Sequence, residues 1–172
     1  MNQYDPFLEK RQCIADALAR LNITYQCYEH PPLDNCHRAD ELALVRSGQR
    51  IKTLFLQDNP GKRHFLLVVP AHTQVNLKQL ASDNQTKRLG FASARRLQKY
   101  LNLTPGSVSP LGLIFDKDQK VELWIEQNLW HDAKALQCHP GDNRQTWVID
   151  KSDLERFFHW TEHLFTLVTL TE

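Results

Sequence analysis

The sequence of 172 residues predicts an α+β fold, in which a mixed or mostly antiparallel sheet packs against surrounding helices. Segments rich in β-branched and aromatic residues outnumber the segments with helical periodicity. Several of these strands are joined by short turns such as Asp58-Asn59-Pro60-Gly61, which are typical of antiparallel pairs. The strict alternation of strand and helix that indicates a Rossmann fold is missing.

Helices are predicted where a capping residue precedes apolar side chains at helical spacing. The first follows Asp5-Pro6, because proline favours the first helical position. The second ends before Gly48, the fourth is capped by Ser93, and the last opens with the capping box Ser152-Asp153-Leu154-Glu155. In chain order, the predicted helices cover residues 5–21, 38–47, 76–82, 93–101 and 152–160.

Strands are predicted from alternating or continuous apolar runs that end at turn-forming residues. The first covers residues 23–28 and ends at His30-Pro31-Pro32, since proline cannot donate to a ladder. Residues 51–56 and 65–69 form a hairpin. The remaining predicted strands cover residues 89–92, 108–115, 121–126, 134–138, 145–149 and 165–170.

The composition is that of one globular domain, with 24% charged and 41% hydrophobic residues. No apolar run approaches the roughly 20 residues of a membrane helix. The first ten residues lack the apolar core of a signal peptide. We therefore predict a single cytoplasmic domain over residues 1–172, with its core at about 30–165, a helix at about 5–21 and no membrane association.

The common signatures of nucleotide binding, P-loops, zinc proteases and serine hydrolases are absent from the sequence. Cys36-His37 and Cys138-His139 would supply zinc ligands as adjacent pairs, but adjacent strand residues point to opposite faces. We therefore expect reduced thiols, no metal site and no cofactor.

Lys52 interrupts an apolar strand. Period two places it with Leu54 and Leu56, so a buried lysine there needs an anionic partner or a polar pocket. The alternative is a lysine at a strand end whose charged group stays in water, and the pattern alone favours this alternative.

Two loops carry groups that suit ligand binding. Pro105-Gly106-Ser107-Val108-Ser109-Pro110-Leu111-Gly112 predicts a fixed backbone with free N–H groups for an anion or carbonyl, although a tight turn explains it equally well. His139-Pro140-Gly141-Asp142-Asn143 presents a histidine and an amide, or is an ordinary turn. His30, next to Pro31, is the other histidine of interest.

The net charge of +1 conceals an uneven distribution. Residues 59–115 carry a charge of +7, and the flanks carry −6. Such a segment suits a phosphate backbone, although a solvated helix face is a common alternative. The basic residues singled out here are Lys87, Arg88, Arg95, Arg96 and Lys99.

Taken in order, five motifs resemble the YbaK/ProX family, the free-standing relatives of the editing domain of bacterial prolyl-tRNA synthetase. The resemblance runs from about His30 to the C-terminal helix. The motifs are Lys52-Thr53-Leu54-Phe55-Leu56, Asn76-Leu77-Lys78-Gln79-Leu80, Phe91-Ala92-Ser93, Pro105-Gly106-Ser107-Val108-Ser109-Pro110-Leu111-Gly112, and His139-Pro140 with Asn143.

The resemblance implies a curved, barrel-like sheet and a hydrolase that removes a wrong amino acid from tRNA, most often alanine from proline tRNA. Lys52, Gly106 and His139 are its implied catalytic residues, and a ribose hydroxyl of the terminal adenosine helps to activate water. The implied substrate-binding residues are Thr53, Ser107, Val108, Ser109, Pro110, Asn143 and His30. The basic residues Lys87, Arg88, Arg95, Arg96 and Lys99 would contact tRNA.

Several alternatives stay open at this point. The chain departs from many alanine-specific members at Thr53, where they carry Asn, and at Glu162-His163, where they carry Gly-His. Cysteine, serine or threonine are therefore alternative amino acids. A non-catalytic tRNA- or aminoacyl-binding module and a small-molecule hydrolase are alternative functions. We expect a monomer or weak dimer, with prolyl-tRNA synthetase as a further partner.

Overall fold

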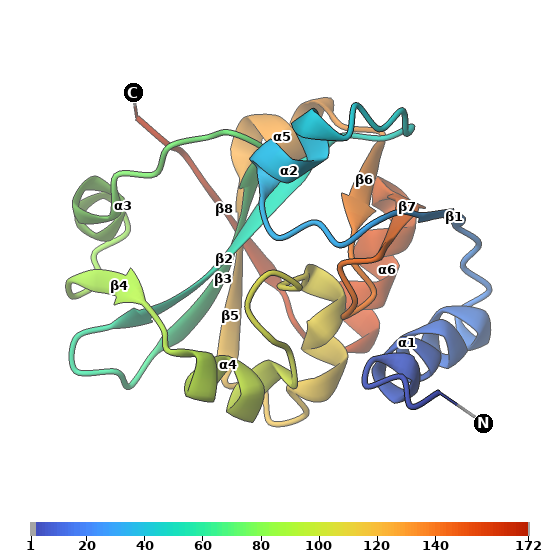
Figure 1. The fold of residues 1–172 in the computed structure, drawn as a ribbon. Helices are drawn as coiled ribbons and strands as arrows, with labels where there is room; N and C mark the ends of the chain where they lie inside the picture. Colours follow the sequence, from blue (N-terminus) through green and yellow to red (C-terminus); the bar gives the residue numbers. More distant parts are fainter. Residues whose placement is uncertain (1–2, 172) are drawn as a thin grey trace.

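The computed structural model describes residues 3–171, which form two sheets and the helices around them (Figure 1). The strands are β1 (Gln26–Glu29), β2 (Ile51–Asp58), β3 (His64–Pro70), β4 (Leu89–Phe91), β5 (Val121–Glu126), β6 (Ala135–Cys138), β7 (Gln145–Asp150) and β8 (Phe165–Val168). The helices are α1 (Leu8–Arg20), α2 (Cys36–Glu41), α3 (Leu77–Asp83), α4 (Ala94–Leu101), α5 (Gln127–Asp132) and α6 (Lys151–Trp160), with the 3₁₀ helix η1 (Pro110–Phe115).

The larger sheet is mixed. Its strand order is β4-β2-β3-β5-β8, with antiparallel pairing on both sides of β2 and parallel pairing on both sides of β5. The smaller sheet, β1-β7-β6, is antiparallel. The predicted α+β class and the hairpin of β2 and β3 are confirmed. The two sheets remain open, so the barrel-like closure implied by the resemblance is not part of this fold.

The central strand β3 is buried on both faces. Leu66 and Val68 belong to one hydrophobic cluster, which also contains residues of α1, α6 and the small sheet. Phe65 and Leu67 belong to a second cluster, which contains residues of α3. Figure 1 shows α3 on one side of the large sheet and α1 and α6 on the other. Full burial of each such side chain contributes roughly 1.5–3 kcal/mol.

The predicted strand at residues 108–115 is wrong. The chain forms η1 there, because Pro110 cannot donate to a ladder and favours the first position of a helix. The Ser109 hydroxyl accepts a hydrogen bond from the N–H of Leu111 at 3.2 Å and caps this helix.

The predicted helix at residues 38–47 is much shorter than expected. Asn35 caps α2 by accepting from the N–H of Arg38, and the helix ends at Glu41. Ala43 then takes a positive φ of 47°, which a right-handed helix does not allow. Residues 42–50 consequently run as a loop along the opening of the cavity described below.

The first and last predicted helices exist, but their capping was predicted wrongly. Asp5 accepts from the N–H of Phe7, yet α1 begins only at Leu8. Ser152 lies inside α6, which begins at Lys151 without a side-chain cap. The helix α5 was not predicted; Glu126 caps it by accepting from the N–H groups of Asn128 and Leu129. Within residues 3–171, no helix is both long and apolar enough to span a membrane.

Candidate functional site

A cavity of about 610 Å³ opens between α2, the start of β2, the turn from β6 to β7, and the loop before η1. It brings together residues that are far apart in the sequence. Of the residues predicted from the sequence, it is lined by Lys52, Thr53, Gly106, Val108, Pro110 and His139. The volume lies within the range of small-ligand pockets, so the cavity is large enough for an amino acid and a nucleoside fragment.

Lys52 lies on the cavity wall near the start of β2. Its Nζ donates a hydrogen bond to the carbonyl oxygen of Thr73, which follows β3. An ammonium group has three donors, so two remain for a ligand. Lys52 is therefore held against the protein, in contrast to the freely hydrated strand-end lysine that the pattern alone favoured.

The loop before η1 has the fixed backbone that its composition predicts. Gly106 takes a φ of 85°, in the left-handed region that favours glycine. The N–H of Ser107 donates to the carbonyl oxygen of Thr104, and the buried Ser109 caps η1. Within residues 3–171, the N–H groups of Gly106 and Val108 donate to no protein acceptor. Both residues line the cavity, where such donors suit a carbonyl oxygen that gains negative charge.

His139 presents one defined nitrogen. Its Nδ1 lies 2.8 Å from the carbonyl oxygen of Gln145. A carbonyl oxygen only accepts, so Nδ1 carries the proton and Nε2 is left as an acceptor. Burial lowers the pKa of His139 below its usual value, which favours the neutral ring.

His30 does not line the cavity, but it supports the cavity wall. Its Nε2 lies 2.7 Å from the hydroxyl of Thr146, to which Arg46 also donates at 3.0 Å. Arg46 and Thr146 do line the cavity. Of the buried side-chain polar atoms within residues 3–171, Nε of Arg46 is one of the few without a partner. Arg46 and Thr146 were missed from the sequence, because neither belongs to a motif and their contact spans 100 residues.

Asn143 does not line the cavity but contacts two residues that do. Its side-chain amide donates to Asp34 at 3.2 Å, and its carbonyl oxygen accepts from the N–H of Leu33. Asp34 and Leu33 line the cavity. Asn143 thus joins the turn after His139 to the segment before α2.

The same turn is fixed by a buried carboxylate. Asp142 is 1% exposed, and its side chain accepts from Arg144 and from Arg11 of α1. Burial raises the pKa of Asp142, but these hydrogen bonds outweigh it and hold the pKa below its usual value. Asp5 accepts from both arginines and completes the network.

The two departures from the alanine-specific pattern lie in different places. Thr53 lines the cavity, where its side chain can influence which amino acid fits. Glu162 and His163 do not line it; Glu162 takes a φ of 62° and His163 bonds Asp116 at 2.8 Å. A positive φ explains why glycine suits the position of Glu162 in other members.

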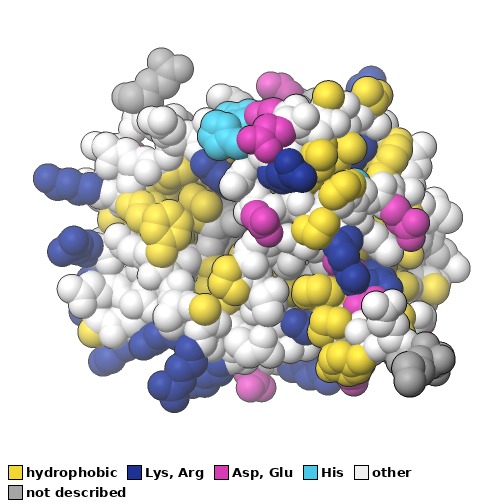
Figure 2. Space-filling model, in the orientation of Figure 1, with side chains coloured by type: hydrophobic (Ala, Val, Ile, Leu, Met, Phe, Trp, Pro, Cys, Tyr) yellow, Lys and Arg dark blue, Asp and Glu magenta, His cyan; other side chains and the backbone are white. Residues whose placement is uncertain are grey.

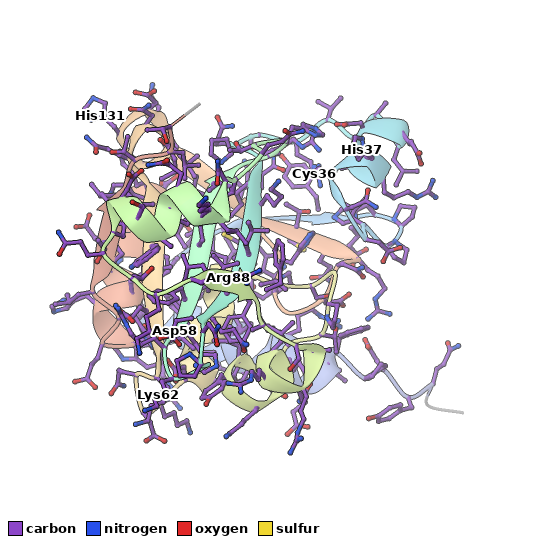
Figure 3. All side chains as sticks on the ribbon, turned by 90° about the vertical axis from the view of Figure 1, so that its left-hand side faces the viewer. Cys36, His37, Asp58, Lys62, Arg88 and His131 are labelled. Carbon is purple, nitrogen blue, oxygen red and sulfur yellow. The ribbon has the colours of Figure 1, made fainter. Side chains whose placement is uncertain are left out.

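The predicted tRNA-contacting residues lie outside the cavity. Lys87, Arg88, Arg95 and Lys99 are exposed, whereas Arg96 is half-buried and donates to the carbonyl oxygen of Gly61 and to His64. Figure 2 shows lysine and arginine side chains gathered over α4 and the turn between β2 and β3. Figure 3 shows Lys62, in that turn, far from Cys36 and His37 at the cavity.

The cysteines are unpaired within the described residues. Cys36 and Cys138 line the cavity, and burial raises the pKa of Cys138 to about 12. Cys138 is therefore a neutral thiol at physiological pH and unsuited to nucleophilic attack.

Comparison with known proteins agrees with this fold. Residues 30–157 match the family model of the aminoacyl-tRNA editing domain. The prolyl-tRNA editing protein ProX of Acetoanaerobium sticklandii is 32% identical over 163 residues, which cover 95% of this chain and 99% of that protein. The prolyl-tRNA synthetase associated domain-containing protein 1 of Danio rerio is 31% identical over 157 residues, or 91% of this chain and 85% of that protein.

A solved structure extends the comparison to the whole fold. A crystal structure described as a candidate trans-editing enzyme for prolyl-tRNA synthetase superimposes with a TM-score of 0.70. It is 16% identical and the match covers 99% of both chains. At this identity, the likeness concerns the fold alone.

Proposed function

Because the chain belongs to the aminoacyl-tRNA editing domain family, we propose that it is an aminoacyl-tRNA deacylase that acts in trans on mischarged tRNA. The substrate we propose is alanyl-tRNA(Pro), whose ester bond joins alanine to the terminal ribose. Prolyl-tRNA synthetase is then the enzyme that supplies the mischarged tRNA. We place this reaction in the cytoplasm and assign it to a monomer or weak dimer.

The observation that carries this proposal is the cavity that joins Lys52, Gly106 and His139. Within the described residues, no serine lines the cavity. Of the two cysteines that do, the buried Cys138 is a neutral thiol, and the thiol of Cys36 has no hydrogen-bonded base among these residues. The lining residues thus favour a reaction that needs positioning and charge stabilisation rather than a protein nucleophile. An aminoacyl ester is already activated, so these two effects supply much of the acceleration.

In the proposed reaction, water attacks the ester carbonyl carbon and the carbonyl oxygen gains negative charge. The N–H groups of Gly106 and Val108 donate to that oxygen, and Lys52 binds the 3′ end of the tRNA. The neighbouring ribose hydroxyl of the terminal adenosine orients the water, as the family resemblance implies. The C–O bond then breaks, a proton returns to the ribose oxygen, and free amino acid and tRNA are released.

His139 is assigned a positioning role in this reaction. Its Nε2 can accept a hydrogen bond from the α-amino group or from a ribose hydroxyl. Arg46 adds a cation to the same wall. Thr53 is assigned a role in amino-acid choice. A synthetase pocket distinguishes amino acids by only ~1–3 kcal/mol per methylene, so a second, size-selective hydrolytic site is needed.

The test is a panel of tRNA(Pro) charged with alanine, cysteine, serine, threonine or proline, with release of the amino acid as the measurement. We expect hydrolysis of the alanyl species and no hydrolysis of the prolyl species. Preference for the cysteinyl, seryl or threonyl species would replace alanine as the proposed substrate. Absence of hydrolysis together with salt-sensitive tRNA binding would identify a non-catalytic binding module. Equal hydrolysis of free amino-acid esters would identify a small-molecule hydrolase.

A further inference from the structure

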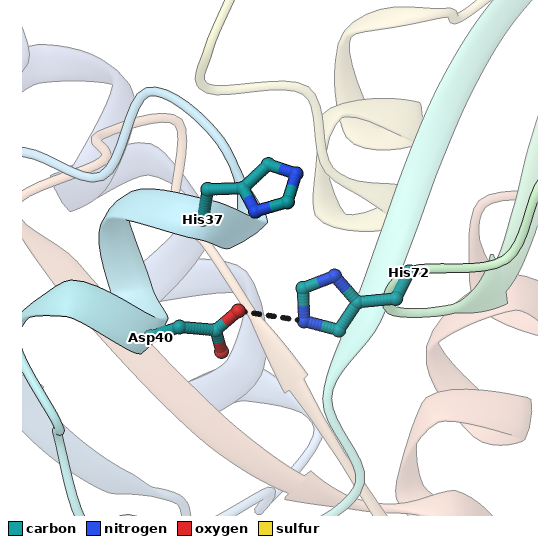
Figure 4. Close-up of side chains that lie close together, drawn as sticks. All are labelled: His37, Asp40 and His72. Carbon is teal, nitrogen blue, oxygen red and sulfur yellow. Dashed lines mark ion pairs between the residues drawn. The ribbon is translucent and has the colours of Figure 1, made fainter.

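A group of three side chains lies at the rim of the cavity, and the proposed hydrolysis makes no use of it. His37 and Asp40 are three residues apart on α2, so they share one face of this helix. His72 approaches them from the segment after β3. Figure 4 shows the two side chains of α2 directed toward His72. One nitrogen or oxygen of each residue lies within 4.8 Å of the others, and all three residues are exposed.

The three side chains are of types that commonly bind metal ions, and they lie close to one another. Nε2 of His72 lies 3.0 Å from Oδ2 of Asp40, and the two histidine rings are 5.6 Å apart between centroids. Arg50 donates to the other carboxylate oxygen of Asp40 at 2.6 Å. Arg50 thereby orients the carboxylate and leaves Oδ2 toward the histidines, as outer partners of metal ligands do.

The backbone holds His72 in an unusual conformation. Its φ is 67°, in the left-handed region that only a few per cent of residues other than glycine adopt. Two hydrogen bonds fix the segment around it: the N–H of Ala71 donates to Arg50, and that of Thr73 donates to Pro70. Thr73 in turn accepts from Lys52. His72 is therefore presented toward α2 by a segment that the cavity wall itself anchors.

The geometry points to a binding site for one divalent transition-metal ion of the zinc class, formed by His37, Asp40 and His72. Two imidazoles and one carboxylate suit zinc, cobalt or nickel better than magnesium or calcium, which prefer oxygen ligands. On binding, the ion replaces the hydrogen bond between His72 and Asp40, and the remaining ring proton of His72 lies on its other nitrogen. Neither cysteine of the pairs Cys36-His37 and Cys138-His139 is needed as a ligand.

Such an ion would join α2 to the segment after β3 across the opening of the cavity. Both His37 and His72 line the cavity, so three protein ligands leave a coordination position on that side for water or an anionic oxygen. Because α2 has only six residues and is otherwise capped by Asn35 alone, this bridge would stabilise it against the rest of the protein.

The experiment uses the full chain, freed of metal with a chelator, and ZnCl₂ as the probe. Equilibrium dialysis is expected to give one bound zinc per chain, and zinc is expected to raise the temperature of thermal unfolding. Cobalt in place of zinc is expected to give the visible absorption bands of a four- or five-coordinate ion. His37→Ala and His72→Asn should each weaken zinc binding by at least about tenfold. Asn is chosen at position 72 because it tolerates a positive φ.

The matched controls are His131→Ala and His159→Ala, which remove exposed histidines elsewhere, and Cys36→Ser, which removes the neighbouring thiol. All three should bind zinc as the parent chain does. The proposal is overturned if no zinc binds, if His72→Asn binds as well as the parent, or if Cys36→Ser alone abolishes binding. Circular dichroism checks that each variant is folded. None of these measurements uses deacylation, so their outcome is separate from that of the proposed function.

Discussion

Nδ1 of His139 donates to the carbonyl oxygen of Gln145 across 2.8 Å, and this contact determines which nitrogen faces a ligand. Because burial lowers the pKa of His139 below the usual 6.5, more than half of the rings are neutral at pH 6.5. The pH at which deacylation falls to half on the acidic side should therefore lie below 6.5. The pH profile of kcat is the measurement.

Two variants separate this effect from other titrations. His139→Gln should lower kcat by about a hundredfold and abolish the acidic limb of the profile. His131→Gln, which changes an exposed histidine, should leave the profile unchanged. An acidic limb that persists in His139→Gln would assign the titration to another group.

Lys52→Ala should lower kcat/KM by roughly 10²–10³-fold, because it removes the charged contact that holds the reacting 3′ end in place. Lys52→Met keeps the apolar part of the side chain and should be equally inactive. The matched control is Lys120→Ala, an exposed lysine outside the cavity, which should retain full activity. Single-turnover deacylation measures all three, and activity in Lys52→Met would show that the charge is dispensable.

Gly106→Ala should destabilise the fold by about 1–2 kcal/mol, because a Cβ at a φ of 85° is strained. The new Cβ itself would have room, with its nearest neighbour, Nδ2 of Asn143, at 3.6 Å. Gly90→Ala is the control: Gly90 has no positive φ, and a Cβ there meets no atom within 4 Å. Urea unfolding measures both variants, and equal stability would contradict the strain assigned to Gly106.

Asp142→Asn should destabilise the protein by roughly 2 kcal/mol, since it removes the charge of a buried acceptor that bonds the partly exposed Arg11 and Arg144. Asp153→Asn, in an exposed pair with Arg156, should change stability by less than about 1 kcal/mol. The folded pKa of Asp142 lies below 3.8, so its contribution is present above that pH and is lost as the pH falls through the lower, folded value. Urea unfolding at several pH values checks this, and identical acid sensitivity in Asp142→Asn would contradict it.

Neutralising Lys87, Arg88, Arg95 and Lys99 should weaken tRNA binding without changing the hydrolytic step. Each phosphate contact that is lost reduces the slope of log K against log salt by about 0.7–0.9. KM should rise while kcat stays the same, because these residues lie outside the cavity. The control removes Lys120 and Lys134, two exposed lysines of the acidic flanks. An unchanged salt slope in the fourfold variant would place the tRNA on another surface.

Local sequence pattern was sufficient for several features. The continuous apolar run at residues 65–69 predicted the strand β3, and Ser93 capped α4 as predicted, with its hydroxyl accepting from the N–H of Arg96. Ordered motifs indicated the family, because Lys52, the loop at Gly106 and the turn at His139 recur as short strings. Local pattern was insufficient at Pro110, whose ring favours the start of η1, and at Ala43, which takes a positive φ that alanine seldom adopts.

Which of these residues lie together depends on tertiary packing. Arg46 and Thr146 are 100 residues apart, and His72 reaches α2 from beyond β3. No sequence period relates such pairs, because their contacts depend on how the sheets and loops pack. The same holds for Arg96, whose charge predicted a tRNA contact but whose guanidinium bonds Gly61 and His64. Sequence specifies the chemistry that each residue can offer, whereas packing determines the partners with which it is used.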